Sequence, residues 1–156
     1  MTSRHDPLLS FRLARLTALA TAAVLAHSAH AQLVPEKMVR VPVEQAAFAP
    51  FGIPGTEVVQ VYGRVGGGVP TAMLSRLDPG KSMPLPHTHT QGYWAVVVSG
   101  TMQHWELSEP DRGPPLRPGS IWFQPGGKPH TEICVSKEAC MIYVYFSTAA
   151  DFTPVK

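Results

Sequence analysis

The chain has 156 residues, of which 44% are hydrophobic and 15% charged, and its 13 basic and 11 acidic side chains give a net charge of +2. This length fits a single domain, and the near balance of charge argues against a nucleic-acid-binding protein, which would carry a basic face. The hydrophobic content excludes a disordered chain, and two cysteines are too few for a disulfide scaffold. The 16 prolines and 13 glycines recur throughout, so a helical bundle is excluded as well.

The first 31 residues have the layout of a secretory signal peptide. Three arginines precede an apolar run at residues 16–26, and Ala29-His-Ala31 supplies the small residues expected before a cleavage site. The apolar run is too short for a permanent membrane span. We therefore predict an exported protein, periplasmic or extracellular, with no stable membrane anchor. Removing residues 1–31 leaves equal numbers of basic and acidic side chains, so nothing electrostatic points to a nucleic-acid partner.

The rest of the chain divides into an arm, a strand-rich region and a short tail. Residues 32–55 contain four prolines and predict an extended N-terminal arm, whereas residues 151–156 are expected to form a C-terminal tail. Between them, runs rich in Val, Ile, Tyr, Trp and Phe alternate with Gly- and Pro-containing turns. The expected strands cover residues 56–62, 70–77, 93–99, 101–107, 120–124, 131–136 and 140–147. Short strands at this spacing predict an all-β sandwich or small barrel over residues 56–150.

Three histidines in the strand-rich region carry the clearest chemical signal. His87 and His89 are separated by one residue, and side chains at i and i+2 of a strand lie on the same face. Two imidazoles in that position can bind one ion at about 2.0–2.1 Å, and His130 at the start of a later strand could add a third. The competing interpretation is that an exposed His-x-His pair is ordinary polar strand surface.

These residues resemble the motifs of the cupins. The second cupin motif reads Gly-x5-Pro-x-Gly-x2-His-x3-Asn, and the chain matches it through Gly119, Pro125, Gly127 and His130, with Cys134 in place of the final asparagine. The cupin resemblance implies a jelly-roll barrel, also called a double-stranded β-helix. It also allows a homodimer, because cupins often dimerise.

The first cupin motif, Gly-x5-His-x-His-x3/4-Glu-x6-Gly, is matched less completely. The chain follows it from Gly80 through His87 and His89 to Gly100, but it has one extra residue before His87 and Tyr93 at the glutamate position. The sequence around the two histidines is also similar to an uncharacterised cupin group with secreted members. The resemblance implies that His87, His89 and His130 are the ligands of one divalent ion per chain, with Fe, Zn, Cu, Mn and Ni as the candidates.

Three histidine ligands without a carboxylate imply an open and strongly positive metal site. Such a site favours a small chelating or anionic ligand and resembles that of dioxygenase cupins, so we expect a metal-dependent oxygenase. Two alternatives stay open. One is a non-catalytic cupin that binds or senses a metal or small ligand, and the other is a zinc-type hydrolase or isomerase.

Four neighbouring residues are candidates for further roles in the site. Strand parity places Gln91 and Tyr93 on the face of His87 and His89 if no bulge intervenes, so both are expected to line the substrate pocket. The Tyr93 hydroxyl could act as a catalytic acid, and His104 on the next strand as a catalytic base. Glu132 is the carboxylate that could replace the missing glutamate, and Gln91 or Tyr93 could instead complete the coordination.

Two cysteines flank a predicted hairpin turn. Cys134 and Cys140 are six residues apart, and in an oxidising compartment a cross-strand disulfide between them is the leading expectation. The alternative is a reactive thiol or a soft metal ligand near His130.

Overall fold

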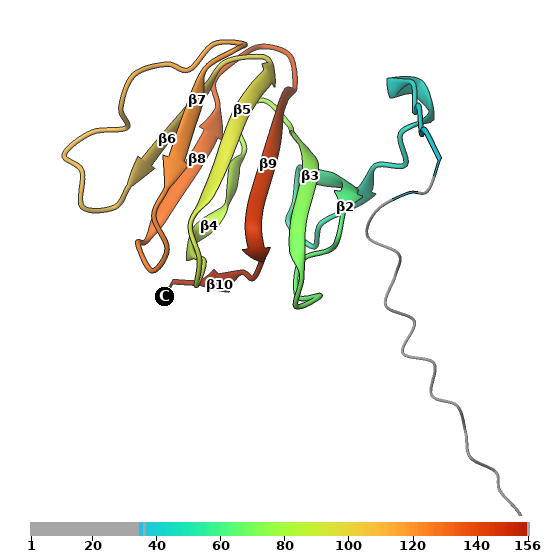
Figure 1. Ribbon diagram of the computed structural model, residues 1–156. Coiled ribbons are helices and arrows are strands. Elements are labelled where there is room, and N and C mark those ends of the chain that lie inside the picture. Colours follow the sequence, from blue (N-terminus) through green and yellow to red (C-terminus); the bar gives the residue numbers. More distant parts are fainter. Residues whose placement is uncertain (1–34, 36, 156) are drawn as a thin grey trace, which may run out of the picture. The chain divides into compact units, whose positions relative to one another are not determined.

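The computed structural model describes residues 35 and 37–155, and gives the backbone alone for residues 82–85. The predicted signal peptide lies outside the described residues. Within them the chain is almost entirely β-structure (Figure 1). The elements are the 3-10 helix η1 Val43–Gln45 and the strands β1 Ala49–Pro50, β2 Thr56–Tyr62, β3 Pro70–Leu77, β4 Ser82–Thr88, β5 Tyr93–Ser99, β6 Met102–Glu106, β7 Ile121–Gln124, β8 His130–Cys134, β9 Cys140–Ala149 and β10 Thr153–Pro154.

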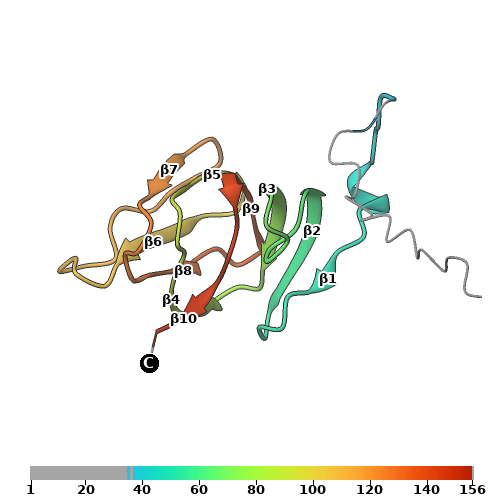
Figure 2. The same ribbon diagram turned by 60° about the horizontal axis from the view of Figure 1, so that its bottom comes forward.

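The strands form two antiparallel sheets. The larger sheet has the order β1-β2-β3-β9-β5-β7, and the smaller one has the order β10-β4-β8-β6. Strands that are neighbours in the chain often lie in different sheets, as β3 and β4 do, which is the crossing pattern of a jelly roll (Figures 1 and 2). The all-β prediction is therefore confirmed.

Alternating side chains build the core between the two sheets. Along β9, Cys140, Ile142, Val144 and Phe146 are buried and point inward, whereas Tyr145 between them is exposed. Strand β5 has the same period, with Tyr93, Ala95 and Val97 in its buried set. Because successive side chains of a strand point to opposite faces, these patterns aim both strands at one shared interior.

Strand β4 was not among the runs expected from the sequence, because Pro84 and Pro86 weaken its strand signal. In the structure β4 pairs with β8 through Ser82, Met83 and His87, and the register shifts between Met83 and His87. The prolines therefore fall where the ladder of hydrogen bonds is interrupted and no backbone donor is needed. This irregular strand ends beside the histidines of the site.

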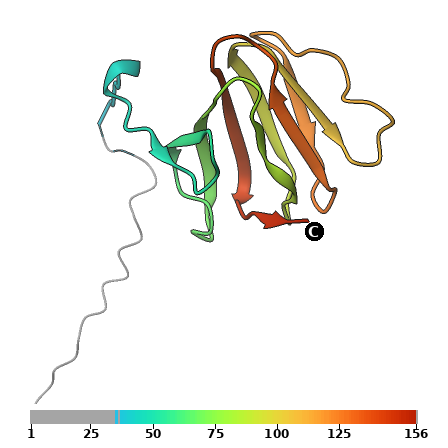
Figure 3. The same ribbon diagram turned by 180° about the vertical axis from the view of Figure 1, so that it is seen from behind.

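The C-terminal residues belong to the smaller sheet. Thr153 and Pro154 of β10 pair with Thr88 and His87 of β4, and the amide of Val155 donates a hydrogen bond to the carbonyl of Pro86 at 2.7 Å. Figures 1 and 3 show β10 crossing the end of the barrel next to β4. The predicted tail is thus an edge strand that packs against the strand carrying His87.

The disulfide between Cys134 and Cys140 is present, with the two Cα atoms 5.6 Å apart, as the sequence predicted. It connects the end of β8 to the start of β9, and these strands lie in different sheets. In the part of the chain that the structure describes, no helix is both long and apolar enough to cross a membrane.

Candidate metal and substrate site

Strand register brings the three predicted ligands together. His87 of β4 and His130 of β8 are direct cross-strand partners, and His89 follows one residue after the end of β4. One ligand nitrogen from each of the three residues lies within 4.8 Å of the other two. His87 and His130 are buried, at 2% and 0% exposure, and His89 is partly exposed. The structure thus places all three predicted ligands in one cluster.

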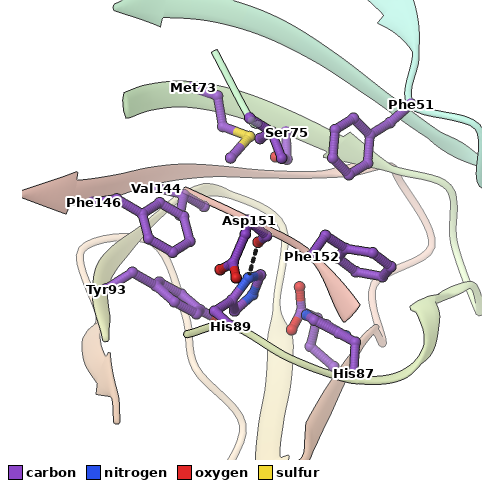
Figure 4. A pocket seen from close by; sticks show the side chains of 12 residues that line it. Phe51, Met73, Ser75, His87, His89, Tyr93, Val144, Phe146, Asp151 and Phe152 are labelled. Carbon is purple, nitrogen blue, oxygen red and sulfur yellow. Dashed lines mark hydrogen bonds between the residues drawn. The ribbon is translucent and has the colours of Figure 1, made fainter. Parts of the chain in front are cut away.

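Backbone carbonyls orient two of these rings. Nδ1 of His130 donates a hydrogen bond to the carbonyl of Lys128 at 2.9 Å, and Nδ1 of His89 donates one to the carbonyl of Asp151 (Figure 4). With the proton held on Nδ1, Nε2 carries the lone pair in each ring. Carbonyl partners of this kind fix the tautomer and ring angle of metal-binding histidines. The donor set therefore fits a divalent ion such as Zn, Fe or Cu.

Burial keeps two imidazoles of the cluster in the neutral form. Burial lowers the pKa of His89, and it lowers the pKa of His130 from 6.5 to about 4. Both rings are therefore neutral at neutral pH, which is the form that binds metal.

Glu132 faces the same pocket from β8, two residues after His130. Burial on its own would raise the pKa of this carboxyl, which is 2% exposed. A hydrogen bond from His104 and the charge of that ring outweigh burial and lower the pKa of this carboxyl. The carboxylate is therefore ionised, so the interior carries a negative charge that a three-histidine site alone would lack.

His104 lies behind Glu132 and holds it. The two residues are cross-strand partners on β6 and β8, and Nδ1 of His104 is 3.2 Å from Oε2 of Glu132. Nε2 of His104 is 2.8 Å from Oε1 of Gln124, and its ring stacks on Trp122 at 4.9 Å. His104 does not line the pocket. The structure thus places His104 against Glu132, outside the pocket lining, and its role as a catalytic base stays a prediction.

Tyr93 lines the pocket, with its hydroxyl 3.4 Å from Nε2 of His130. Burial, followed by the charge of Glu132, raises the pKa of the phenol well above 10. The hydroxyl therefore stays protonated and acts as a hydrogen-bond donor.

The structure does not bring Gln91 to the cluster, because it is exposed and does not line the pocket. The parity argument assumed one continuous strand from His87 to Tyr93. The chain instead leaves the smaller sheet after Thr88 and enters the larger sheet at Tyr93. Residues 89–92 form the connection, so alternation does not carry over from one strand to the next.

Sequence reasoning missed two residues of the segment between β9 and β10. The carbonyl of Asp151 orients His89, and its carboxylate accepts hydrogen bonds from the amide and the hydroxyl of Thr90. Phe152 stacks on His87 with ring centroids 4.6 Å apart and planes at 28°. No motif marks these residues, and they reach the site only because β10 returns to β4.

We expect an Asp151→Ala variant to bind metal with roughly tenfold lower affinity. Alanine removes the hydrogen bonds from Thr90 to the carboxylate, which hold the carbonyl of residue 151 against the ligand His89. The number of ions bound at saturation should not change, since all three ligands remain. Titration against a competing chelator measures this difference. Asp111→Ala is the matched control, because Asp111 accepts a hydrogen bond from Gly113 in an exposed loop. Equal affinities for the two variants would contradict the positioning role.

The metal-free protein should lose stability in mild acid. His130 has a pKa of about 4 in the folded protein and about 6.5 when unfolded, so unfolding takes up a proton between these values. The stability is complete above pH 6.5 and falls toward pH 4, by up to about 3 kcal/mol from this residue. The lowered pKa of Glu132 also makes the folded protein less stable as the pH falls in the acid range. Urea unfolding at pH 7.5 and 4.5 tests this, and His130→Gln should show a smaller loss.

Comparison with known proteins identifies the fold family. A cupin domain model matches residues 73–146, which include both histidine motifs. No curated protein matches the chain. Among solved structures, KdgF from Halomonas sp. is 18% identical, covering 74% of this chain and 94% of that chain, with a TM-score of 0.54. The polyketide cyclase RemF from Streptomyces resistomycificus is 22% identical, covering 77% and 87%, with a TM-score of 0.58.

A third similar structure is a sugar phosphate isomerase of the cupin superfamily from Silicibacter pomeroyi, 19% identical, covering 75% of this chain and 76% of that chain, with a TM-score of 0.53. Identities at this level establish the fold and leave the activity to the residues of the site. The two-sheet barrel and the match over residues 73–146 agree, and this part of the chain is a cupin domain.

Proposed function

We propose that this protein is an exported, metal-dependent oxygenase that acts on a small chelating or anionic molecule. The observation that carries the proposal is the cluster of His87, His89 and His130, whose ligand atoms lie within 4.8 Å of one another. His87 and His89 also line a pocket. Three protein ligands leave positions free for two further molecules. A bound divalent ion would supply Lewis acidity and hold substrate and dioxygen side by side.

The residues around the cluster have roles that do not depend on the metal's identity. The ionised Glu132 lies in the pocket and can take a proton from an acidic C–H, O–H or S–H group of the substrate. His104 keeps the carboxylate in place, and the Tyr93 hydroxyl can donate a hydrogen bond to an oxygen of the substrate. Apolar side chains of β3 and β9 line this region.

The second candidate is an isomerase or hydrolase, and the buried Glu132–His104 pair favours it. A base held at a fixed position beside a cation is the arrangement that proton transfer needs, with or without dioxygen. A cupin that only binds or senses its ligand would not require this ionised carboxylate.

Two measurements separate these functions. The first is the metal content of purified protein, followed by dioxygen uptake with Fe(II)-loaded protein and a panel of β-diketones and thiols. The second is exchange of substrate C–H for deuterium in D2O, which requires Glu132 and should be lost in Glu132→Gln. Oxygen uptake supports the oxygenase, exchange without uptake supports the isomerase, and metal binding with neither supports a binding protein.

The proposed export is supported by the signal-like residues 1–31 and by the disulfide, which forms in oxidising compartments. N-terminal sequencing of protein recovered from the compartment outside the inner membrane should give a chain that begins at Gln32. An intact N-terminus would contradict it.

A further inference from the structure

The outward side of the larger sheet is covered by apolar side chains. Trp94 of β5 lies directly opposite Phe123 of β7 and Tyr145 of β9, and Val96 lies opposite Ile121. Direct cross-strand partners point to the same face, so these residues form two neighbouring rows. The alternate residues of β5 and β9 point into the core, and the two rows therefore face away from it. An antiparallel sheet with one face in water ordinarily carries polar residues on that face.

This outer face, completed by Val98 of β5, is uncovered in the single chain. Five of its residues are 41–62% exposed, namely Trp94, Val98, Ile121, Phe123 and Tyr145. None of the residues in the two rows is charged. Strand β7 is also the edge of its sheet, and its sequence Ile-Trp-Phe-Gln has no lysine or proline to discourage contact with another chain. A continuous apolar surface of this kind marks a place where another molecule binds.

The arm before β1 carries a second set of uncovered apolar residues. Val39, Val41 and Val43 alternate with Arg40 and Pro42, and an extended segment of this pattern presents its valines on one side. The three valines and the methionine at position 38 are 57–75% exposed. Within the described chain, these side chains therefore gain little burial from their own barrel.

We propose that two copies of this chain form a dimer in which the arm of each copy lies on the outer face of the other. Each chain carries one uncovered arm and one uncovered face, so a two-fold axis pairs them twice and closes the assembly. The exposed surface of these residues amounts to roughly 900 Å² per copy, against about 800 Å² per partner in a standard interface. A second copy is thus the occupant that accounts for both surfaces and supplies the area that a stable dimer needs.

The arm is long enough for this contact. Its base is held at Phe48, whose ring centroid lies 4.3 Å from the guanidinium carbon of Arg76. Residues 37–47 in front of it reach up to about 35 Å when extended. The outer face runs over the neighbouring strands β9, β5 and β7, which is a width of only about 10 Å. The valines can therefore lie across all three strands of a partner.

Sedimentation velocity on the exported protein measures the association, and we expect a dimer at micromolar concentrations. The face variant Ile121→Glu, Phe123→Glu and the arm variant Val39→Glu, Val41→Glu should each weaken dimerisation at least about thirtyfold, the effect of losing one central interface contact. All four positions are exposed, so both variants should fold, and their melting curves check this. Leu107→Glu is the matched control, because Leu107 is 45% exposed but follows β6 of the smaller sheet, and it should leave dimerisation unchanged.

Mixing the two variants tests which surfaces meet. The face variant keeps an intact arm and the arm variant keeps an intact outer face, so a mixed dimer regains one of the two contacts. The mixture should associate at least about tenfold more tightly than either variant alone. A dimer in which two outer faces packed directly together would show no such rescue, because every mixed pair would contain one damaged face.

Three results would overturn the inference. One is an unsubstituted protein that stays monomeric at high micromolar concentration, whether or not it binds lipid vesicles. Another is an arm variant that dimerises as the unsubstituted protein does, and the third is a mixture that shows no rescue. None of these results depends on bound metal, so the proposed function stands or fails separately.

Discussion

The double variant His87→Ala, His130→Ala is expected to reduce bound metal from about one ion per chain to less than roughly a tenth of that. These residues are cross-strand partners, and their removal leaves His89 as the last member of the cluster. A single imidazole at a partly exposed position cannot hold a divalent ion against a chelator. Elemental analysis after dialysis with excess zinc measures the loss, and the melting curve of the metal-free variant establishes that it is folded.

The fourth histidine of the described chain provides the matched control. His104→Gln keeps all three members of the cluster and removes one contact of Glu132, so the bound metal at saturation should stay at about one ion per chain. Its affinity is expected to fall by much less than in the double variant. If the double variant kept the metal, or if His104→Gln lost it equally, the ligand assignment would be wrong.

Replacing both cysteines by alanine is expected to lower the free energy of unfolding by roughly 2–4 kcal/mol. The disulfide closes a short loop, which accounts for about 2 kcal/mol, and both side chains are fully buried between the sheets, where alanine leaves empty space. Alanine is chosen over serine because a buried hydroxyl would add its own cost.

Urea unfolding of the oxidised protein and the Cys134→Ala, Cys140→Ala variant provides the measurement. The reduced protein with both thiols present is the control, since it lacks the bridge but keeps most of the volume of the two side chains. It should fall between the other two in stability. A difference below about 0.5 kcal/mol between the oxidised protein and the variant would show that the bridge contributes little to the fold.

The histidine cluster was predictable because each part of it is a short local motif, and the resemblance of these motifs to those of the cupins implied that the two parts meet. The His-x-His pair and the Pro-x-Gly-x2-His turn each place their side chains within a few residues, so the motifs carry the positions of His87, His89 and His130. The cysteine pair was predictable for the same reason.

Contacts between distant segments were not predictable in this way. The exposed position of Gln91 was not predictable, because periodicity cannot show that a strand ends at Thr88 and that the next strand belongs to another sheet. The contact of His104 with Glu132 depends on the register of β6 against β8, 28 residues apart. Asp151 reaches Thr90 across 61 residues, and nothing in either local sequence signals it.

Because β10 pairs with β4, the affinity of the site for a ligand is coupled to the docking of this last strand of the chain. Asp151 and Phe152 contact His89 and His87 while β10 is paired, so a ligand at the histidines and the docking of this strand must favour each other by the same free energy. The amide of Val155, bonded to the carbonyl of Pro86, reports that docking. Hydrogen exchange of this amide should slow when the site is filled. The factor should equal the factor by which undocking of β10 lowers the affinity of the site for its ligand.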